Sequence, residues 1–298
     1  CSFLGVKANI VVNPDDSALQ NSFLLLESVE EYKSAFVDKV LGQELLTPTS
    51  LVIIVDASNP KIFESPEIYE NADRVAIIDH HVQTNEFENV PKLQYIDPTA
   101  SSASELLCEI LEQAIPRAQL KNAEAELLLA GVLLDTQRFT RNTGIRTFGA
   151  AMYLHLDASA LSRALALFKP SIDEYTKLAV FQKNTVVFRE IIAISHYDGD
   201  NSVENRVMAS MAAENMLNIA SIRAAFTLCR VGTDIHISGR SDGSINVSKI
   251  LEQLNGGGRF EAAATVMKSV SLEDAMKQLR AAIESYWDEK FPSGSDKK

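Results

Sequence analysis

Cysteine is scarce in this sequence. Only three cysteines occur among 298 residues, Cys1, Cys108 and Cys229, and they lie far apart and form no CxxC pair. The chain therefore lacks the disulfide framework that is typical of small secreted domains. Cys108 and Cys229 lie in apolar runs, so we expect them to pack as small hydrophobic side chains. This cysteine usage indicates a reducing, cytoplasmic compartment.

Long apolar runs and surplus positive charge are also missing. No apolar run approaches the roughly 20 residues that a membrane span needs, and no signal peptide opens the sequence, so we expect no membrane contact by this part of the chain. The formal net charge is -12. This balance argues against a general binder of long nucleic acid, because such proteins present a basic face. It is compatible with a small phosphorylated substrate, because surplus aspartates can hold cations that attract phosphate.

Two short apolar segments rich in β-branched residues predict buried, parallel strands. They are LVIIVD, which ends at Asp56, and RVAIID, which ends at Asp79; Leu93–Ile96 is a third candidate. Helical patterns lie between and after them, including an amphipathic stretch over Glu27–Leu41 and a nearly all-apolar stretch over Ala123–Leu134. This alternation predicts an α/β domain with a mainly parallel sheet.

A turn followed by a helix start is predicted after the third strand candidate. The turn covers Asp97–Ser102, and Ser102 with Glu105 fits a capping box ahead of the apolar run LLCEIL.

The pattern of strands and helices restarts near residue 185. The helical stretch Ser171–Asn184 is predicted to be a connector, and the residues after it alternate between strand and helix up to a last helix over Leu272–Tyr286. We therefore predict two domains. The first covers residues 1–185 and includes the connector, and a smaller α/β domain covers residues 186–298.

Carboxylates and imidazoles gather where the strands are expected to end. Asp56 ends one strand, and Asp79 ends the next and is followed directly by His80 and His81. In open α/β sheets, ligands bind outside the carboxyl ends of the strands, and imidazole with carboxylate suits manganese, iron or zinc. The alternative is that each aspartate caps a turn and that ordinary hydrogen bonds satisfy both histidines.

Three further features carry polar chemistry. Asp135 ends the run LLLAGVLLD, which has no other charge, so it needs a metal ion or a helix cap as its partner.

In the second domain, Ser238 and Arg240 end a strand, and the run Gly256–Gly258 precedes Arg259. Consecutive glycines let backbone N–H groups approach an anion, although a flexible turn explains the glycines equally well on their own. Together these features indicate a phosphate or nucleotide clamp.

A series of motifs along nearly the whole chain resembles the DHH phosphoesterase superfamily with its DHH-associated C-terminal domain. The series is VDAS, AIIDHH, DPTASSASEL, AGVLLDTQRFT, SGRS and LNGGGRFEAAAT. The segment FTRNTGIRTFGAAMYL is most similar to the GdpP-type cyclic-di-AMP phosphodiesterases, more than to the oligoribonucleases (nanoRNases) or the RecJ-like exonucleases.

The resemblance implies a dinuclear site, usually manganese, in a cleft between the two domains. Asp56 would bridge both Mn²⁺ ions, and His80 and Asp135 would be further metal ligands. Asp79 and His81 are the catalytic candidates, because Asp79 would orient the histidines and His81 would lie near the scissile phosphate. From the second domain the nucleotide would be held by Ser238, Arg240, Gly256, Gly257, Gly258 and Arg259.

Two features depart from the family pattern. The family's first motif, His-x-x-x-Asp-x-Asp, has no match near the start, where Asp15 and Asp16 are adjacent and no histidine precedes them. We therefore expect that a segment before Cys1 carries this motif and that the sequence at hand supplies about half of a metal site. Arg259 stands where the family signature has histidine. Its guanidinium can bind phosphate through two hydrogen bonds but cannot act as a neutral imidazole acceptor.

The activity that the resemblance implies is hydrolysis of the second messenger cyclic-di-AMP to 5′-pApA. Two divalent ions about 3.5–4 Å apart would lower the pKa of a bridging water. The resulting hydroxide would attack phosphorus in line with the departing 3′-oxygen, which His81 would protonate.

Two alternatives stay open. One is a nanoRNase-like enzyme for short oligonucleotides or 3′-phosphoadenosine-5′-phosphate (pAp), and the other is a catalytically inactive nucleotide-binding module. The resemblance also implies a membrane-tethered parent protein with this part facing the cytosol, and it leaves a homodimer open.

Overall fold

The three strand candidates of the first domain pair into a parallel sheet in a computed structural model of the chain, which describes residues 1–13, 20–27, 29–83 and 86–290. The strands are β3 (Val52–Val55), β4 (Val75–Asp79) and β5 (Leu93–Ile96), in the order β3-β4-β5. β4 is the central strand and is buried along its whole length, which explains its unbroken apolar sequence. The register places Val55 opposite Ile78 and Asp79 opposite Ile96, so the carboxyl ends of the strands share one edge.

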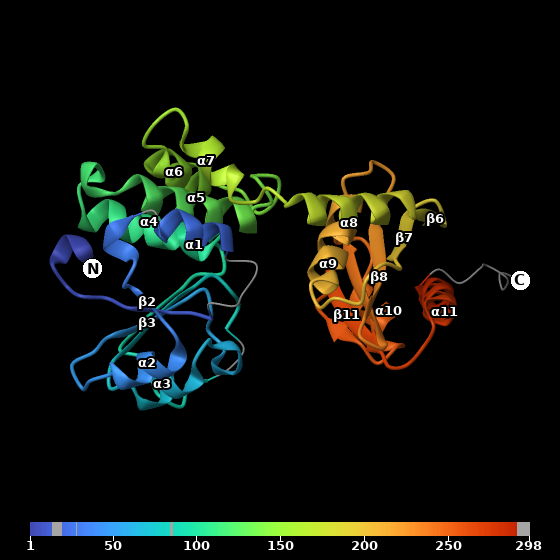
Figure 1. Cartoon of the computed structure of the whole chain (residues 1–298), viewed down its shortest axis with the longest axis horizontal. Helices are drawn as coiled ribbons and strands as arrows, with labels where there is room; N and C mark the ends of the chain where they lie inside the picture. The colour runs from blue at the N-terminus through green and yellow to red at the C-terminus, as the bar shows by residue number, and fades with distance from the viewer. Residues whose placement is uncertain (14–19, 28, 84–85, 291–298) are drawn as a thin grey trace, which may run out of the picture. The chain divides into compact units, whose positions relative to one another are not determined.

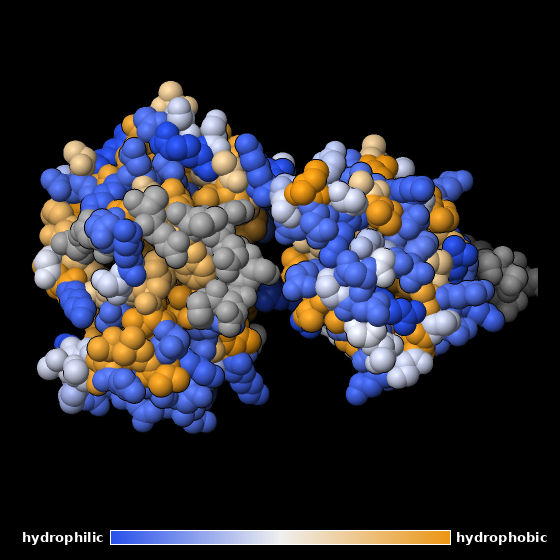
Figure 2. Space-filling model, viewed as in Figure 1, coloured by the Kyte–Doolittle hydropathy of each residue, from blue (hydrophilic) through white to orange (hydrophobic). Residues whose placement is uncertain are grey.

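Helices lie on both sides of this sheet (Figure 1). Those on one side pack around a core that includes Leu129, Leu133 and Leu154, and α4 contacts β4. The helices of this region are α1 (Gln20–Glu27), α2 (Lys39–Glu44), α3 (Pro66–Asn71), α4 (Ala103–Ala114), α5 (Asn122–Asp135), α6 (Ile145–Leu154) and α7 (Ala160–Ala166). Single 3-10 turns cover Ser2–Leu4, Glu30–Tyr32, Pro60–Ile62 and Arg117–Gln119. On the face seen in Figure 2, apolar side chains gather over α2, where Val40 and Leu41 are exposed.

The helix predicted over Glu27–Leu41 is wrong. The described part of that stretch holds the end of α1, a 3-10 turn, strand β2 (Phe36–Val37) and the start of α2. β2 pairs in parallel with β1 (Ile10–Val11), and this pairing competes successfully with a continuous helix. Asp38 then begins α2 because its side chain accepts a hydrogen bond from the Leu41 N–H, at 2.8 Å.

The second unit is built on a six-stranded mixed sheet in the order β10-β11-β9-β8-β7-β6. Only β7 and β8 run parallel to each other. One face packs against α8 and α9, and the other packs against α10 and α11 around Phe226, Leu228, Ile235 and Ile237. The strands are β6 (Val186–Phe188), β7 (Ile192–Tyr197), β8 (Ala224–Val231), β9 (Asp234–Ser241), β10 (Gly257–Gly258) and β11 (Ala262–Met267). The helices are α8 (Ile172–Lys183), α9 (Asn205–Met216), α10 (Val247–Glu252) and α11 (Leu272–Lys290).

The chain divides into its two units between Lys169 and Pro170, earlier than the boundary near residue 185 that the sequence indicates. The difference is α8, which the helical pattern over Ser171–Asn184 predicts to be a connector that belongs to the first domain. Its Leu178 and Phe181 are buried in the same cluster as side chains of α9 and the sheet, so α8 packs as part of the second unit. The α/β fold class and the parallel sheet of the first region are confirmed. The cleft between the domains stays a prediction.

None of the helices within the described ranges combines the length and the apolar composition that crossing a membrane requires.

Candidate metal centre

Each strand of the parallel sheet ends at an aspartate. Asp79 is the last residue of β4, and Asp56 and Asp97 directly follow β3 and β5. Backbone hydrogen bonds extend the sheet past these ends, from Asp56 N–H to the Ile78 carbonyl at 2.9 Å and from Asp97 N–H to the Asp79 carbonyl at 3.0 Å. The sheet therefore brings three carboxylates to one edge, where ligands of open α/β sheets bind.

The side chains of Asp56, His80 and Asp135 converge at this edge. His80 Nε2 lies 3.4 Å from Asp56 Oδ1 and 3.7 Å from Asp135 Oδ2. His81 joins the group, because ligand atoms of Asp56, His80 and His81 all lie within 4.8 Å of one another. Asp135 comes from a separate element, the end of α5, so the fold and not sequence proximity assembles the set.

The local backbone shows why Asp56 and Asp135 stand where they do. Asp56 has a φ of 63°, in the left-handed region, and a non-glycine residue pays roughly 1–2 kcal/mol to adopt it. After Asp135 the chain turns left-handed over Gln137–Phe139, and the Arg138 N–H bonds to the Leu133 carbonyl at 2.7 Å, which ends α5. Strained backbone of this kind is often retained at functional sites.

Asp79 holds His81 in place. The Asp79 side chain is fully buried, and its Oδ1 accepts hydrogen bonds from the His81 backbone N–H at 3.2 Å and from His81 Nδ1 at 2.8 Å. Burial raises the pKa of Asp79, but the hydroxyl of Ser58 and the two groups of His81 outweigh it and lower that pKa overall. Asp79 therefore stays ionised and keeps the proton on Nδ1, which leaves Nε2 for another partner.

The resemblance to the DHH phosphoesterases predicts that Asp79 orients both histidines. Among the residues that the structure describes, its hydrogen bonds to a histidine go to His81. His80 lies beside His81, with 4.3 Å between the ring centroids, and it faces Asp56 and Asp135 instead. Asp79 Oδ2 is buried without a hydrogen-bond partner of regular geometry among the described residues.

The electrostatics of the cluster suit a cation. Burial and the nearby charge of Asp56 raise the pKa of Asp135, although His80 and His81 oppose the shift. A hydrogen bond to Asp56 raises the pKa of His80 above its usual value, with burial opposing it and Asp135 adding to it. Two carboxylates that repel each other and an imidazole between them form a donor set that fits Mn²⁺, Fe²⁺ or Zn²⁺. Asp15 and Asp16 lie outside the described residues.

The candidate residues of the second unit are brought together by strand β11. Ser238 and Arg240 of β9 lie opposite Ala264 and Ala262 of β11, and Gly257 of β10 lies opposite Ala264 from the other side. Arg240 is half-buried against α9, and burial lowers its pKa while Glu214 opposes the shift. The guanidinium donates hydrogen bonds to the Ser210 hydroxyl and, at 2.9 Å, to the Gly239 carbonyl, and its Nε lies 3.5 Å from Glu214 Oε2.

Packing accounts for two of the three consecutive glycines. A Cβ on Gly256 would lie 2.5 Å from the Ala264 carbonyl oxygen, and one on Gly258 would lie 2.4 Å from that of Ala262. Gly258 also has a φ of +153°. Gly257 has nothing within 4 Å of its Cβ position. Arg259 follows them and donates its N–H to the Ala262 carbonyl at 2.7 Å. The last two glycines thus form the short strand β10, which closely approaches β11, and the binding role of the run stays a prediction.

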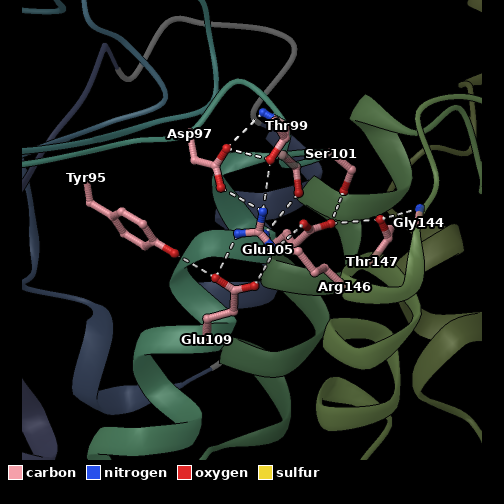
Figure 3. Close-up of polar contacts among 10 residues, drawn as sticks. Tyr95, Asp97, Thr99, Ser101, Glu105, Glu109, Gly144, Arg146 and Thr147 are labelled. Atoms are coloured by element: carbon pink, nitrogen blue, oxygen red, sulfur yellow. Dashed lines mark hydrogen bonds and ion pairs between the residues drawn. The ribbon is translucent and has the colours of Figure 1, made fainter.

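Sequence reasoning missed Asp97 and Arg146 as parts of this region. Figure 3 shows Arg146 of α6 pointing between Asp97 and two glutamates of α4. Asp97 could have been found, because it follows an apolar strand candidate just as Asp56 does. Arg146 gave no such signal, since its partners are distant in sequence.

Residues 9–132 match the DHH family, N-terminal domain, and residues 184–288 match the DHHA1 domain. The chain is 32% identical over 283 residues to the cyclic-di-AMP phosphodiesterase GdpP of Bacillus subtilis, which covers 94% of this chain and 43% of that protein. It is 36% identical over 267 residues to the cyclic-di-AMP phosphodiesterase PdeA of Listeria monocytogenes, which covers 88% of this chain and 40% of that protein. The chain thus spans less than half the length of these relatives.

A solved structure shares the fold. It is an exopolyphosphatase-related protein from Bacteroides fragilis, with a TM-score of 0.74 and 20% sequence identity. The match covers 93% of this chain and 83% of that chain.

Proposed function

Because the chain belongs to the DHH family and carries a DHHA1 domain after its DHH domain, we propose that it is the catalytic part of a metal-dependent phosphodiesterase that hydrolyses cyclic-di-AMP to 5′-pApA. The observation that carries this proposal is the convergence of Asp56, His80 and Asp135 from three separate elements. The relatives named as cyclic-di-AMP phosphodiesterases support a hydrolase and this substrate.

Mn²⁺ is the cation that we assign to the cluster. Asp56, His80 and Asp135 would hold it, with Asp56 the most exposed of the three and so the best placed to face a second ion. When bound, such ions supply a water of lowered pKa and positive charge against the phosphoryl oxygens. The remaining ligands of a two-metal site would come from residues outside this set.

His81 would act as the general acid. Buried Asp79 holds its Nδ1, and the His81 side chain is 36% exposed. Nε2 can therefore meet a substrate. A water oxygen would form the new bond to phosphorus while the bond from phosphorus to the 3′-oxygen breaks. Asp79 would stabilise the imidazolium of His81, which would give the proton on its Nε2 to the departing oxygen and keep the proton on Nδ1. The product keeps its phosphate on the 5′ side, which gives linear 5′-pApA.

The second unit would hold the nucleotide. Ser210 and Glu214 keep Arg240 in a fixed position, so its remaining N–H groups are oriented before a phosphate arrives. Ser238 lies on the same strand as Arg240, β9, and β10 with Gly257 and Gly258 lies on the far side of β11 in the same sheet. Arg259, next to the glycines, adds a second guanidinium to the candidate clamp.

The test is Mn²⁺-dependent turnover of cyclic-di-AMP by the full protein and by its Asp56→Ala variant, with the products separated by chromatography. We expect the wild type to release 5′-pApA and Asp56→Ala to lose at least about 100-fold in turnover. Asp73→Ala is the matched control, because Asp73 is exposed just before β4, at the opposite end of that strand from Asp79.

Other outcomes are equally informative. Unchanged turnover by Asp56→Ala would reject the site. Faster hydrolysis of 5′-pApA, short oligonucleotides or pAp than of cyclic-di-AMP would reject the substrate and favour a nanoRNase-like enzyme. Tight nucleotide binding without any turnover would show an inactive binding module.

A further inference from the structure

Arg146 is the centre of a network of ion pairs and hydrogen bonds with Asp97 and the glutamates of α4 (Figure 3). It is the second residue of α6, and its Nε and Nη2 donate to the two carboxylate oxygens of Glu109 at 2.7 and 3.0 Å. Its Nη1 donates to Asp97 Oδ2 at 2.7 Å. Nε also lies 3.5 Å from Glu105 Oε1. A single guanidinium thus joins α6 to α4 and to the residue that follows β5.

The buried carboxylate of Glu105 extends this network. Glu105 is 1% exposed, and its Oε2 accepts hydrogen bonds from the Ser101 hydroxyl at 2.6 Å and from the Thr147 hydroxyl at 2.7 Å. Asp97 Oδ1 in turn accepts from the Thr99 N–H at 2.9 Å and the Thr99 hydroxyl at 2.6 Å. Asp97, Thr99 and Ser101 of the segment Asp97–Ser102, the β5–α4 loop, are therefore held by contacts that lead to Arg146.

The β5–α4 loop contacts the strand end that carries the histidines. The Asp97 N–H bonds to the Asp79 carbonyl at 3.0 Å, one residue before His80. Ala100 packs in one buried cluster with Ile78 of β4 and Leu106 of α4. The β5–α4 loop therefore packs against and hydrogen-bonds to the end of β4.

We infer that Arg146 is a positioning residue for the metal centre, because it fixes the β5–α4 loop and through it the imidazole of His80. This inference rests on the proposed function, because fixing the position of His80 matters for binding only if His80 holds a cation. Groups that support a metal ligand from behind affect metal affinity although they never touch the metal. The inference also gives a role to helix α6, which contributes none of the three proposed metal ligands.

A second arginine offers a matched control. Arg163 of α7 donates to buried Glu126 of α5 at 2.5 Å and to Asp157 at 2.8 and 3.2 Å. Its side chain is 39% exposed, against 37% for Arg146. Arg163 therefore joins helices of the same unit through equivalent ion pairs, but neither of these partners belongs to the β5–α4 loop. If each arginine only held helices together, replacing either one should change Mn²⁺ affinity by the same amount.

The experiment compares wild type, Arg146→Met, Arg146→Lys and Arg163→Met. Mn²⁺ affinity is measured by calorimetry, and the histidine side-chain nitrogen resonances are recorded in metal-free protein. We expect Arg146→Met to weaken Mn²⁺ binding by about 10-fold and to shift the His80 resonances, and Arg163→Met to change affinity by less than about 2-fold. Arg146→Lys keeps the positive charge but loses the bidentate contact with Glu109, so its Mn²⁺ affinity should lie between those of wild type and Arg146→Met.

A double-mutant cycle separates positioning from general destabilisation. If Arg146 acts through His80, Arg146→Met should cause no further loss of Mn²⁺ affinity in a His80→Ala background. If Arg146→Met destabilises the protein generally, its loss of affinity should add to the loss that His80→Ala causes. Equal effects of Arg146→Met and Arg163→Met on affinity and on the His80 resonances would overturn the inference. Should Arg146→Met fail to fold, the comparison of Arg146→Lys with Arg163→Lys decides it. A wild type that binds no Mn²⁺ would reject the proposed function, and the His80 resonances of the metal-free variants would still judge the positioning role.

Discussion

The candidate metal centre of the first unit and the glycine strand of the second unit carry their unusual residues for different reasons. Asp56 adopts a left-handed backbone, and Asp79 Oδ2 is buried without a regular hydrogen bond among the described residues. Neither feature helps the fold. By contrast, Gly256 and Gly258 are required by the close approach of β11, whatever the strand binds. Residues that oppose stability point to function more strongly than residues that packing already explains.

The comparison has a direct consequence for mutants. Replacing the metal ligand Asp135 should remove activity while leaving the metal-free fold as stable as before or more so. Changes in the glycine strand should first weaken the fold. The predictions below test this contrast, from the largest expected effect to the smallest.

Asp135→Asn should remove activity and leave stability intact. We expect Mn²⁺-dependent turnover to fall at least about 100-fold, because the variant loses a metal ligand. The pKa of Asp135 is raised by burial and by Asp56, so its ionised form is disfavoured in the folded state at neutral pH. The neutral amide removes that penalty, so chemical denaturation in the presence of a chelator should show equal or greater stability. A clear loss of metal-free stability would break the contrast between the two regions.

Asp79→Asn should lower turnover by roughly 10- to 100-fold, because it disturbs a group that orients His81 and not a metal ligand. An amide at this position can donate to His81 Nδ1 and so favours the wrong tautomer. The measurement is kcat together with the Mn²⁺ dissociation constant. Metal affinity close to wild type with a reduced kcat supports the role, whereas an equal loss in both would make Asp79 a part of the metal support.

Gly258→Ala should destabilise the second unit by about 1–3 kcal/mol, because the new Cβ meets the backbone of β11. Gly257→Ala is the matched control, since nothing lies within 4 Å of its Cβ. The chain has one tryptophan, Trp287, which packs against the core of the second unit, so its fluorescence during urea unfolding reports on that unit. Equal stability of both variants would mean that the glycines are not there for packing.

Asp97 should make a small, pH-dependent contribution. Hydrogen bonds from Thr99 and Arg146 lower its pKa from 3.8 to about 2. For an acid with a lowered pKa, the stabilisation is present above about pH 4 and is lost as the pH falls toward about 2. Because the pair is partly exposed, we expect less than about 1 kcal/mol. Thermal unfolding of wild type and Asp97→Asn across this range should converge at the acid end. A constant difference at every pH would show that the contribution is not ionic.

The sequence was informative where chemistry follows a strand end. Asp56, Asp79 and His80 stand out because apolar strands lead directly into them. Of the capping box predicted from Ser102 and Glu105, the structure has the Ser102 half, which accepts from the Glu105 N–H at 3.0 Å, while the Glu105 carboxylate accepts from Ser101 and Thr147. β11 was missed, because its alanines carry little strand preference and its pairing with β9 decides the conformation. The network of Arg146 was also out of reach. Its partners Asp97 and Glu109 lie 49 and 37 residues away, and only the tertiary fold brings them together.

A crystal structure of the protein grown with Mn²⁺, with anomalous scattering recorded at the manganese edge, tests the central claim most directly. We expect a strong anomalous peak within bonding distance of Asp56, His80 and Asp135. Fully occupied Mn²⁺ elsewhere in the crystal, with no peak between these three side chains, would contradict the assignment of this cluster as the metal centre.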